Sequence, residues 1–146
     1  MDGVIVDFRK GCEELNAIEG YKVDWETIHA NGAEFWATLD WTKEGERFYY
    51  WLEKFCDEQG IDLCILSAVN YDDGVYGKLE WLKNHCRIPQ KNIYIVKNGK
   101  AKAKYANETS LLIDDFGKNI EQFVLAGGKG IKFKSAGQTR QELLKL

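Results

Sequence analysis

The stretch SLLIDD, residues 110–115, decides the predicted fold, because a short apolar run ends abruptly in two carboxylates. Continuous apolar runs of this length are typical of strands that are buried on both faces of a parallel sheet. Similar runs occur at 61–67 (IDLCILS) and 92–96 (NIYIV), and a weaker one occurs at 130–133 (GIKF). The four runs predict four strands, of which the last is edge-like because its residues alternate between apolar and polar.

Helical patterns separate these runs. Residues 43–58, 74–86 and 117–126 carry apolar side chains at three- and four-residue spacings. Gly60 and Gly127 follow the first and third segments as stop signals. Strands that alternate with helices predict an α/β fold, in which right-handed crossovers build a parallel sheet between layers of helices.

Length and composition predict one soluble domain over residues 1–146. Residues 9–42 differ from the rest, because they are rich in aromatic side chains and show little strand pattern, and we expect them to form a small insert over the sheet. The net charge of −3 gives no broad attraction to a nucleic acid polymer. No secretory signal and no apolar run long enough for a membrane span is visible, so neither export nor a membrane partner is expected.

The four cysteines are widely spaced and form no CxxC pair. Free thiols in a reducing cytoplasm are therefore the expected state, and a cytoplasmic location is the corresponding prediction.

Chemically useful side chains follow three of the predicted strands. Ligands of open parallel sheets bind beyond the carboxyl ends of the strands. Asp114 and Asp115 are either a site for a divalent cation, which relieves their mutual repulsion, or a helix cap. Ser67, followed by Ala68, is either a phosphate-binding hydroxyl or a turn former. The lysines that precede SLLIDD, most of them expected on the surface, offer one cation for a phosphate; they are Lys97, Lys100, Lys102 and Lys104.

The order of these motifs resembles one known family. DGVIVDF (2–8), LCILSA (63–68), KAKYA (102–106) and LLIDD (111–115), with Asn119 shortly after, are similar to the motifs of the haloacid dehalogenase superfamily of phosphotransferases. Within it, the chain looks most like the small 5'(3')-deoxyribonucleotidase-like branch. The resemblance implies a Rossmannoid three-layer α/β sandwich with a small helical cap.

The resemblance also implies roles for individual residues. Asp2 would be the general acid/base, Ser67 the phosphate-binding hydroxyl and Lys102 the lysine that neutralises the phosphate. Lys100 or Lys104 would replace Lys102 if the loop register slips. The pair Asp114 and Asp115 would hold Mg²⁺, and the expected substrate-binding residues are Gly3, Ala68, Phe35 and Trp36.

The family signature, Asp-x-Asp-Gly-Val, requires a nucleophilic aspartate one residue before Met1, which takes the x position. We therefore expect an incomplete amino terminus, from an upstream start or a partial gene, with a truncated homologue that has lost catalysis as the other explanation. In a second register, 3–8 would be the strand and Asp7 the nucleophile. That register places Arg9 where an acid/base is needed, so Asp7 is expected instead to cap the next helix.

The insert is expected to select the substrate. Aromatic faces stack on any nucleobase, and we expect Phe35 or Trp36 to face the pocket while Trp41 packs. Simple packing of the insert on the sheet is the other explanation for each ring. The predicted function is thus Mg²⁺-dependent hydrolysis of a small phosphomonoester, a nucleoside monophosphate by resemblance. The alternative is a catalytically inactive module that binds phosphate or another protein. A homodimer is one expected oligomeric state besides the monomer.

Overall fold

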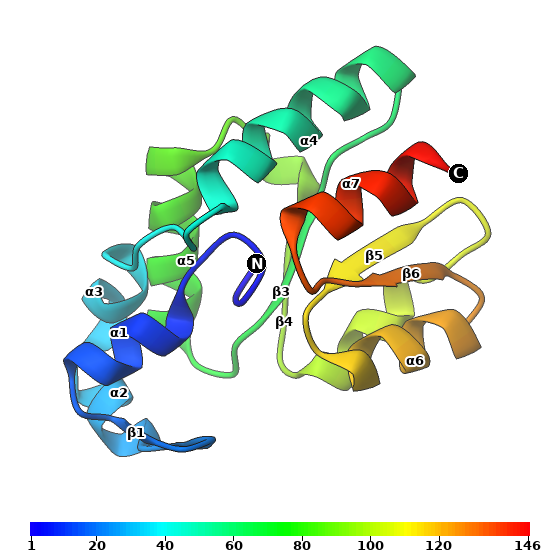
Figure 1. Ribbon diagram of the computed structural model, residues 1–146. Helices are drawn as coiled ribbons and strands as arrows, with labels where there is room; N and C mark the ends of the chain where they lie inside the picture. The colour runs from blue at the N-terminus through cyan, green and yellow to red at the C-terminus, as the bar shows by residue number, and fades with distance from the viewer.

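Helices and short strands alternate along the chain in a computed structural model, which describes residues 1–146 (Figure 1). The helices are α1 (Phe8–Glu14), α2 (Trp25–Ala30), α3 (Gly32–Ala37), α4 (Gly45–Gln59), α5 (Asp72–His85), α6 (Gly117–Leu125) and α7 (Ala136–Leu144), with 3-10 turns η1 (Gln90–Asn92) and η2 (Gly99–Tyr105). The strands are β1 (Ile18–Glu19), β2 (Lys22–Val23), β3 (Ile65–Ala68), β4 (Ile93–Val96), β5 (Leu111–Asp114) and β6 (Lys129–Lys132).

The strands β3 to β6 pair in parallel, as the apolar runs predict. β3 pairs with β4, in a register that sets Ser67 opposite Ile95. β5 pairs with β6, in a register that sets Asp114 opposite Lys132. The mixed α/β class with parallel strands is confirmed, but the strands form two separate two-stranded sheets rather than one.

The amino-terminal run forms a turn. The carbonyl oxygen of Met1 accepts hydrogen bonds from the backbone nitrogens of Val4, Ile5 and Val6, at 3.2, 3.0 and 3.2 Å. Gly3 has φ of +75°, in the left-handed region that glycine tolerates. The register that makes these residues a strand is therefore wrong. Asp7 caps α1 by accepting from the Lys10 nitrogen at 3.0 Å, as expected.

The three predicted helices are present as α4, α5 and α6. Helix α4 buries Phe48 and Tyr49 and ends at Gly60, whose φ of +69° forms a left-handed cap. Helix α7 was not expected from the sequence. It begins with a capping box between Ser135 and Gln138, and its first turn meets α4 where the Ala136 nitrogen donates to Glu44.

Residues 8–37 contribute α1, α2, α3 and the antiparallel pair β1–β2, which lie on one side of the molecule (Figure 1). Helix α3 packs closely on α5 at Gly77, where a Cβ atom would lie 2.6 Å from the Trp36 Cβ and would also collide with the Ala33 carbonyl oxygen. This close packing attaches the aromatic segment to the helix that follows β3. None of the helices combines the length and apolar character needed to cross a bilayer.

Candidate active site

The end of β5 carries a buried ion pair. The Lys102 Nζ donates to Asp114 Oδ2 at 2.6 Å, and both side chains are more than nine-tenths buried. Asn119 Nδ2 donates to the same oxygen at 3.2 Å, and the Phe116 nitrogen donates to Oδ1 at 2.9 Å. Burial opposes ionisation of Asp114, but the hydrogen bond and charge of Lys102 outweigh it and lower the pKa of this carboxyl. Asp114 is therefore held as a carboxylate.

Asp115 lies beside this pair and faces the amino-terminal turn. Burial raises its pKa, and the neighbouring charge of Asp114 raises it further. A Cβ atom on Gly3 would collide with the Asp115 carboxylate, so glycine is needed at position 3 for space as well as for its positive φ. Asp115, one of the two predicted metal-binding residues, thus lies against Gly3, the residue that follows Asp2.

Lys78 organises the end of β3. This lysine of α5 is fully buried, and its Nζ donates to Ser67 Oγ at 2.7 Å, to Asp2 Oδ2 at 2.8 Å and to the Ala68 carbonyl oxygen at 3.0 Å. It connects three residues that the sequence proposes for the site. Sequence reasoning missed Lys78, although it occupies the buried face of α5 together with Trp81 and Leu82.

The two halves of the site meet at the amino-terminal turn. Gly3, the residue after Asp2, lies against the Asp115 carboxylate. Lys78 joins Asp2 to Ser67, and Lys102 pairs with Asp114, the neighbour of Asp115. Asp2, Ser67, Lys102 and Asp114, which come from four separate segments, therefore lie close together at the carboxyl ends of β3 and β5.

The aromatic residues of α3 border this region from inside the protein. The Lys78 ammonium lies 4.8 Å from the Trp36 ring centroid, and Trp36 Nε1 donates to the Tyr71 hydroxyl at 2.5 Å. Phe35 packs edge-to-face on Trp36, and the two side chains are 6% and 3% exposed. Trp41 packs against Trp81 with ring centroids 4.8 Å apart. Trp36 is the predicted ring that lies nearest to the polar residues.

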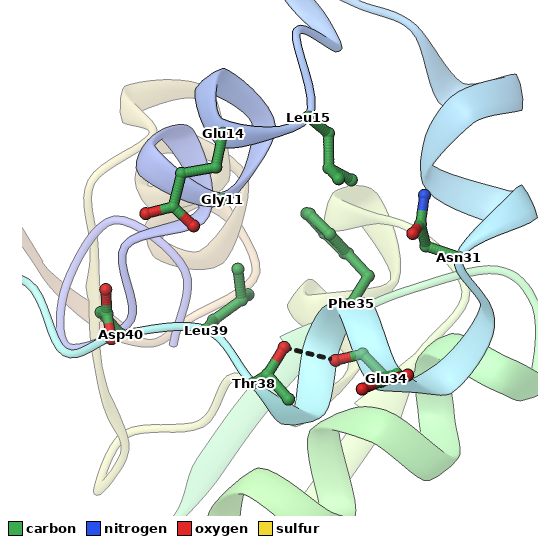
Figure 2. A pocket seen from close by; sticks show the side chains of 9 residues that line it. All are labelled: Gly11, Glu14, Leu15, Asn31, Glu34, Phe35, Thr38, Leu39 and Asp40. Atoms are coloured by element: carbon green, nitrogen blue, oxygen red, sulfur yellow. Dashed lines mark hydrogen bonds between the residues drawn. The ribbon is translucent and has the colours of Figure 1, made fainter.

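A hollow of about 280 Å³ lies between α1 and α3, and its lining residues are drawn in Figure 2. Its walls are Gly11, Glu14, Leu15, Asn31, Glu34, Phe35, Thr38, Leu39 and Asp40. The carboxylates of Glu14, Glu34 and Asp40 repel an anion, so the hollow is unsuited to a phosphate group. Phe35 is the one predicted site residue that lines it.

The residues at the β5 end fit Mg²⁺ by donor type. Mg²⁺ prefers oxygen ligands, keeps several waters and needs only one or two carboxylates. Gly3 lets the Asp115 carboxylate lie against the amino-terminal turn, and the charge of Asp114, after burial, contributes to the raised pKa of Asp115, a repulsion that a cation would relieve. The structure contains no group of three or more His, Cys, Asp or Glu side chains arranged for a metal, so these two carboxylates would act with water and backbone oxygens.

Fold and site define a mixed α/β protein with a polar centre at the carboxyl ends of its parallel strands. No protein-family model matches the chain, and no curated protein matches it.

Proposed function

We propose that this protein is a Mg²⁺-dependent phosphomonoester hydrolase of the haloacid dehalogenase type, which acts on nucleoside monophosphates. One observation carries the proposal: Asp2, Ser67, Lys102 and Asp114, which the resemblance selects from four distant segments, lie around one region of the structure. The finer fold is part of the same proposal. In it, the pairs β3–β4 and β5–β6 belong to one three-layer sandwich, with the segment 9–42 as its cap.

Each residue has a role that its contacts support. The Ser67 hydroxyl donates to a phosphate oxygen, and the ammonium of Lys102 balances phosphate charge beside Asp114. Asp2 first donates a proton to the leaving oxygen. As a carboxylate, it then accepts a proton from the attacking water. Asp114 and Asp115 would hold Mg²⁺, which when bound neutralises charge on the phosphoryl oxygens. The resemblance assigns the nucleophile to an aspartate immediately before Met1.

The test compares two proteins. One is the 146-residue chain, and the other carries four or five apolar residues and an aspartate before Met1. Phosphate release is measured with Mg²⁺ from nucleoside 5'- and 3'-monophosphates and from p-nitrophenyl phosphate. We expect the extended protein to be faster by about 10³-fold or more, because loss of a covalent nucleophile costs roughly 10⁴ to 10⁶ in rate.

The controls separate catalysis from binding. Asp2→Asn in the extended protein should abolish turnover, whereas an extension that ends in Asn should be as slow as the shorter chain. Equal turnover by the extended and shorter chains would refute the assigned roles. Binding of inorganic phosphate without turnover in either protein would instead support the inactive, phosphate-binding alternative.

A further inference from the structure

Two exposed lysines meet at the start of α6. Lys132 is the last residue of β6, and its Nζ would lie 3.6 Å from a Cβ atom on Gly117, the first residue of α6. Lys118 is the second residue of that helix. Both lysines are exposed, and neither forms an ion pair. Their charges are therefore available to a negatively charged ligand.

Lys100 extends this group from the neighbouring turn η2. The residue before it, Gly99, lies against α6, where a Cβ atom would collide with the Asn119 side chain. Lys100 is also exposed and without an ion pair. Three positive charges thus gather in a chain whose net charge is −3. We call this group the basic patch; it consists of Lys100, Lys118 and Lys132.

The basic patch borders the proposed phosphate site. Asn119, which lies against Gly99, donates to Asp114 Oδ2 at 3.2 Å. The charge of Asp114 is balanced by Lys102, and Asp115 is a proposed ligand of Mg²⁺. The carboxylate that remains on this segment is the exposed Glu121, one turn further along α6. Most of the positive charge of the patch is therefore uncompensated.

An exposed aromatic ring lies at the same place. Phe116 directly precedes Gly117, and its backbone nitrogen donates to Asp114 Oδ1 at 2.9 Å. Its side chain is 58% exposed, which is unusual for a phenylalanine. Proteins that bind single-stranded nucleic acids combine lysines, which contact the phosphates, with an aromatic face on which a base stacks. An acidic peptide would use the lysines but would not need the ring.

We propose that the basic patch and Phe116 bind a single-stranded oligonucleotide whose terminal phosphate enters the proposed phosphate site, an inference that rests on the proposed function. The terminal phosphate lies at Ser67 and Lys102, a base near that end stacks on Phe116, and the next phosphates contact the patch. The net charge of −3 gives no attraction over the rest of the surface, so the strand is held by its end. The substrate class then includes the phosphorylated ends of single strands.

The test measures the binding of short oligothymidylates, about six nucleotides long, to the 146-residue chain by fluorescence anisotropy. They carry a phosphate at the 5' or the 3' end and the label at the other. Lys132→Gln removes one charge of the patch, and Lys129→Gln, exposed at the opposite end of β6, is the matched control.

We expect Lys132→Gln to reduce the slope of log Kd against log salt concentration by about 0.7, the contribution of one phosphate contact on a single strand. Lys129→Gln should leave the slope unchanged. Equal effects of the two substitutions would show that lysines anywhere on the surface attract the strand, and would overturn the proposal.

Phe116→Ala tests the stacking contact. It should weaken binding about fivefold or more, and by similar factors for thymine and adenine oligonucleotides, whereas Phe116→Tyr, which keeps a ring, should bind as the wild type does. Unchanged affinity in Phe116→Ala would overturn the proposal. Polyglutamate of similar length should compete weakly; competition as strong as that of the unlabelled oligonucleotide would make the patch a surface for acidic peptides and would overturn it too.

The terminal phosphate separates this inference from the proposed function. Oligonucleotides without it should bind about tenfold more weakly, because the charged contact inside the site is lost. Equal affinity with and without it would show that the strand does not reach the site, and would overturn the inference while the proposed function stands. The proposed function fails instead if the extended protein releases no phosphate from nucleoside monophosphates. The effects of Lys132→Gln and Phe116→Ala are measured without turnover, so they support or overturn binding by the patch in either case.

Discussion

Lys102 and Asp114 form a buried ion pair, and its contribution to stability depends on both partners being present. Removing two charges from water costs several kcal/mol per ion, and their attraction offsets that cost only at short distance with further hydrogen bonds. The 2.6 Å contact, together with the bonds from Asn119 and Phe116, meets that condition. Lys100 and Lys104, the other lysines considered for this role, are exposed. Burial, which the sequence does not show directly, distinguishes Lys102 from its neighbours.

Lys102→Met should destabilise the protein by about 3–5 kcal/mol, because it leaves the Asp114 charge buried without its partner. The free energy of unfolding in urea measures this loss. Lys100→Met, at an exposed position two residues away, should change it by less than about 0.5 kcal/mol. A loss no larger than that of Lys100→Met would contradict the buried pair.

Stability should fall at high pH because of Cys12. Burial, and then the charge of Asp2, raises the pKa of this fully buried thiol to about 11 from its usual 9.0. The folded protein therefore holds the proton more tightly than the unfolded chain, so this stabilisation is complete below pH 9 and is lost as the pH rises to 11. Between pH 9 and 10.5 the loss is about 2 kcal/mol at most.

Urea unfolding at pH 8.5 and 10.5 measures this effect against Cys12→Ala, in which other titrating groups are unchanged. The wild type should lose more stability than Cys12→Ala over this interval. Equal losses in the two proteins would show that the Cys12 thiol ionises in the folded state as easily as in the unfolded chain.

At the scale of helices and strands, the sequence predicts those features that a short stretch of chain determines by itself. Apolar runs predict the four parallel strands, and Gly60 correctly marks the end of α4. Helix α7 was missed because few of its residues are buried. The division into two sheets was also missed, because it depends on hydrogen bonds between distant segments. Lys78 was missed for a related reason: a lysine within a helix is usually exposed, and only the packed structure shows its three acceptors.

Two glycines in helices should respond in opposite ways to alanine. At Gly77 in α5, a Cβ atom would collide with the Ala33 carbonyl oxygen of α3, so Gly77→Ala should destabilise the protein by about 1–3 kcal/mol. At Gly137 in α7, no atom lies within 4 Å of the new Cβ, so Gly137→Ala should stabilise it by about 0.5–1 kcal/mol. Melting temperatures measure both changes. A gain in stability from Gly77→Ala would refute the close packing of α3 on α5.

At the scale of the whole molecule, the apolar interior has two parts. The main cluster includes Val6, Phe48 and Trp81. Leu112, Phe123 and Ile131 are buried but lie outside that cluster, between β5, β6 and α6, which occupy one side of the molecule (Figure 1). The site spans both parts, because Ser67 and Lys78 lie on β3 and α5, which contribute Ile65 and Trp81 to the main cluster, whereas Asp114 ends β5.

This division predicts that the unit formed by β5, β6 and α6 opens before the rest of the protein. Its opening exposes Leu112, Phe123 and Ile131 and separates the half-buried Ile113 from the main cluster, far less apolar surface than global unfolding exposes, so its amides should exchange with solvent at a lower free energy than those of β3 and α5. Native-state hydrogen exchange measures the difference. Leu112→Ala, which removes about 2–5 kcal/mol of packing, should accelerate exchange only within this unit.

Phe48→Ala is the matched variant in the main cluster, and it should accelerate exchange throughout the protein, because global unfolding exposes every amide. If Leu112→Ala accelerates α5 and β3 as much as β5, the chain unfolds as one cooperative unit and the division is refuted. If the unit opens alone, Asp114 and Asp115 separate from Ser67 and Lys78 without global unfolding. A ligand that contacts both halves, such as phosphate with Mg²⁺, should then slow exchange in β5, β6 and α6 more than elsewhere.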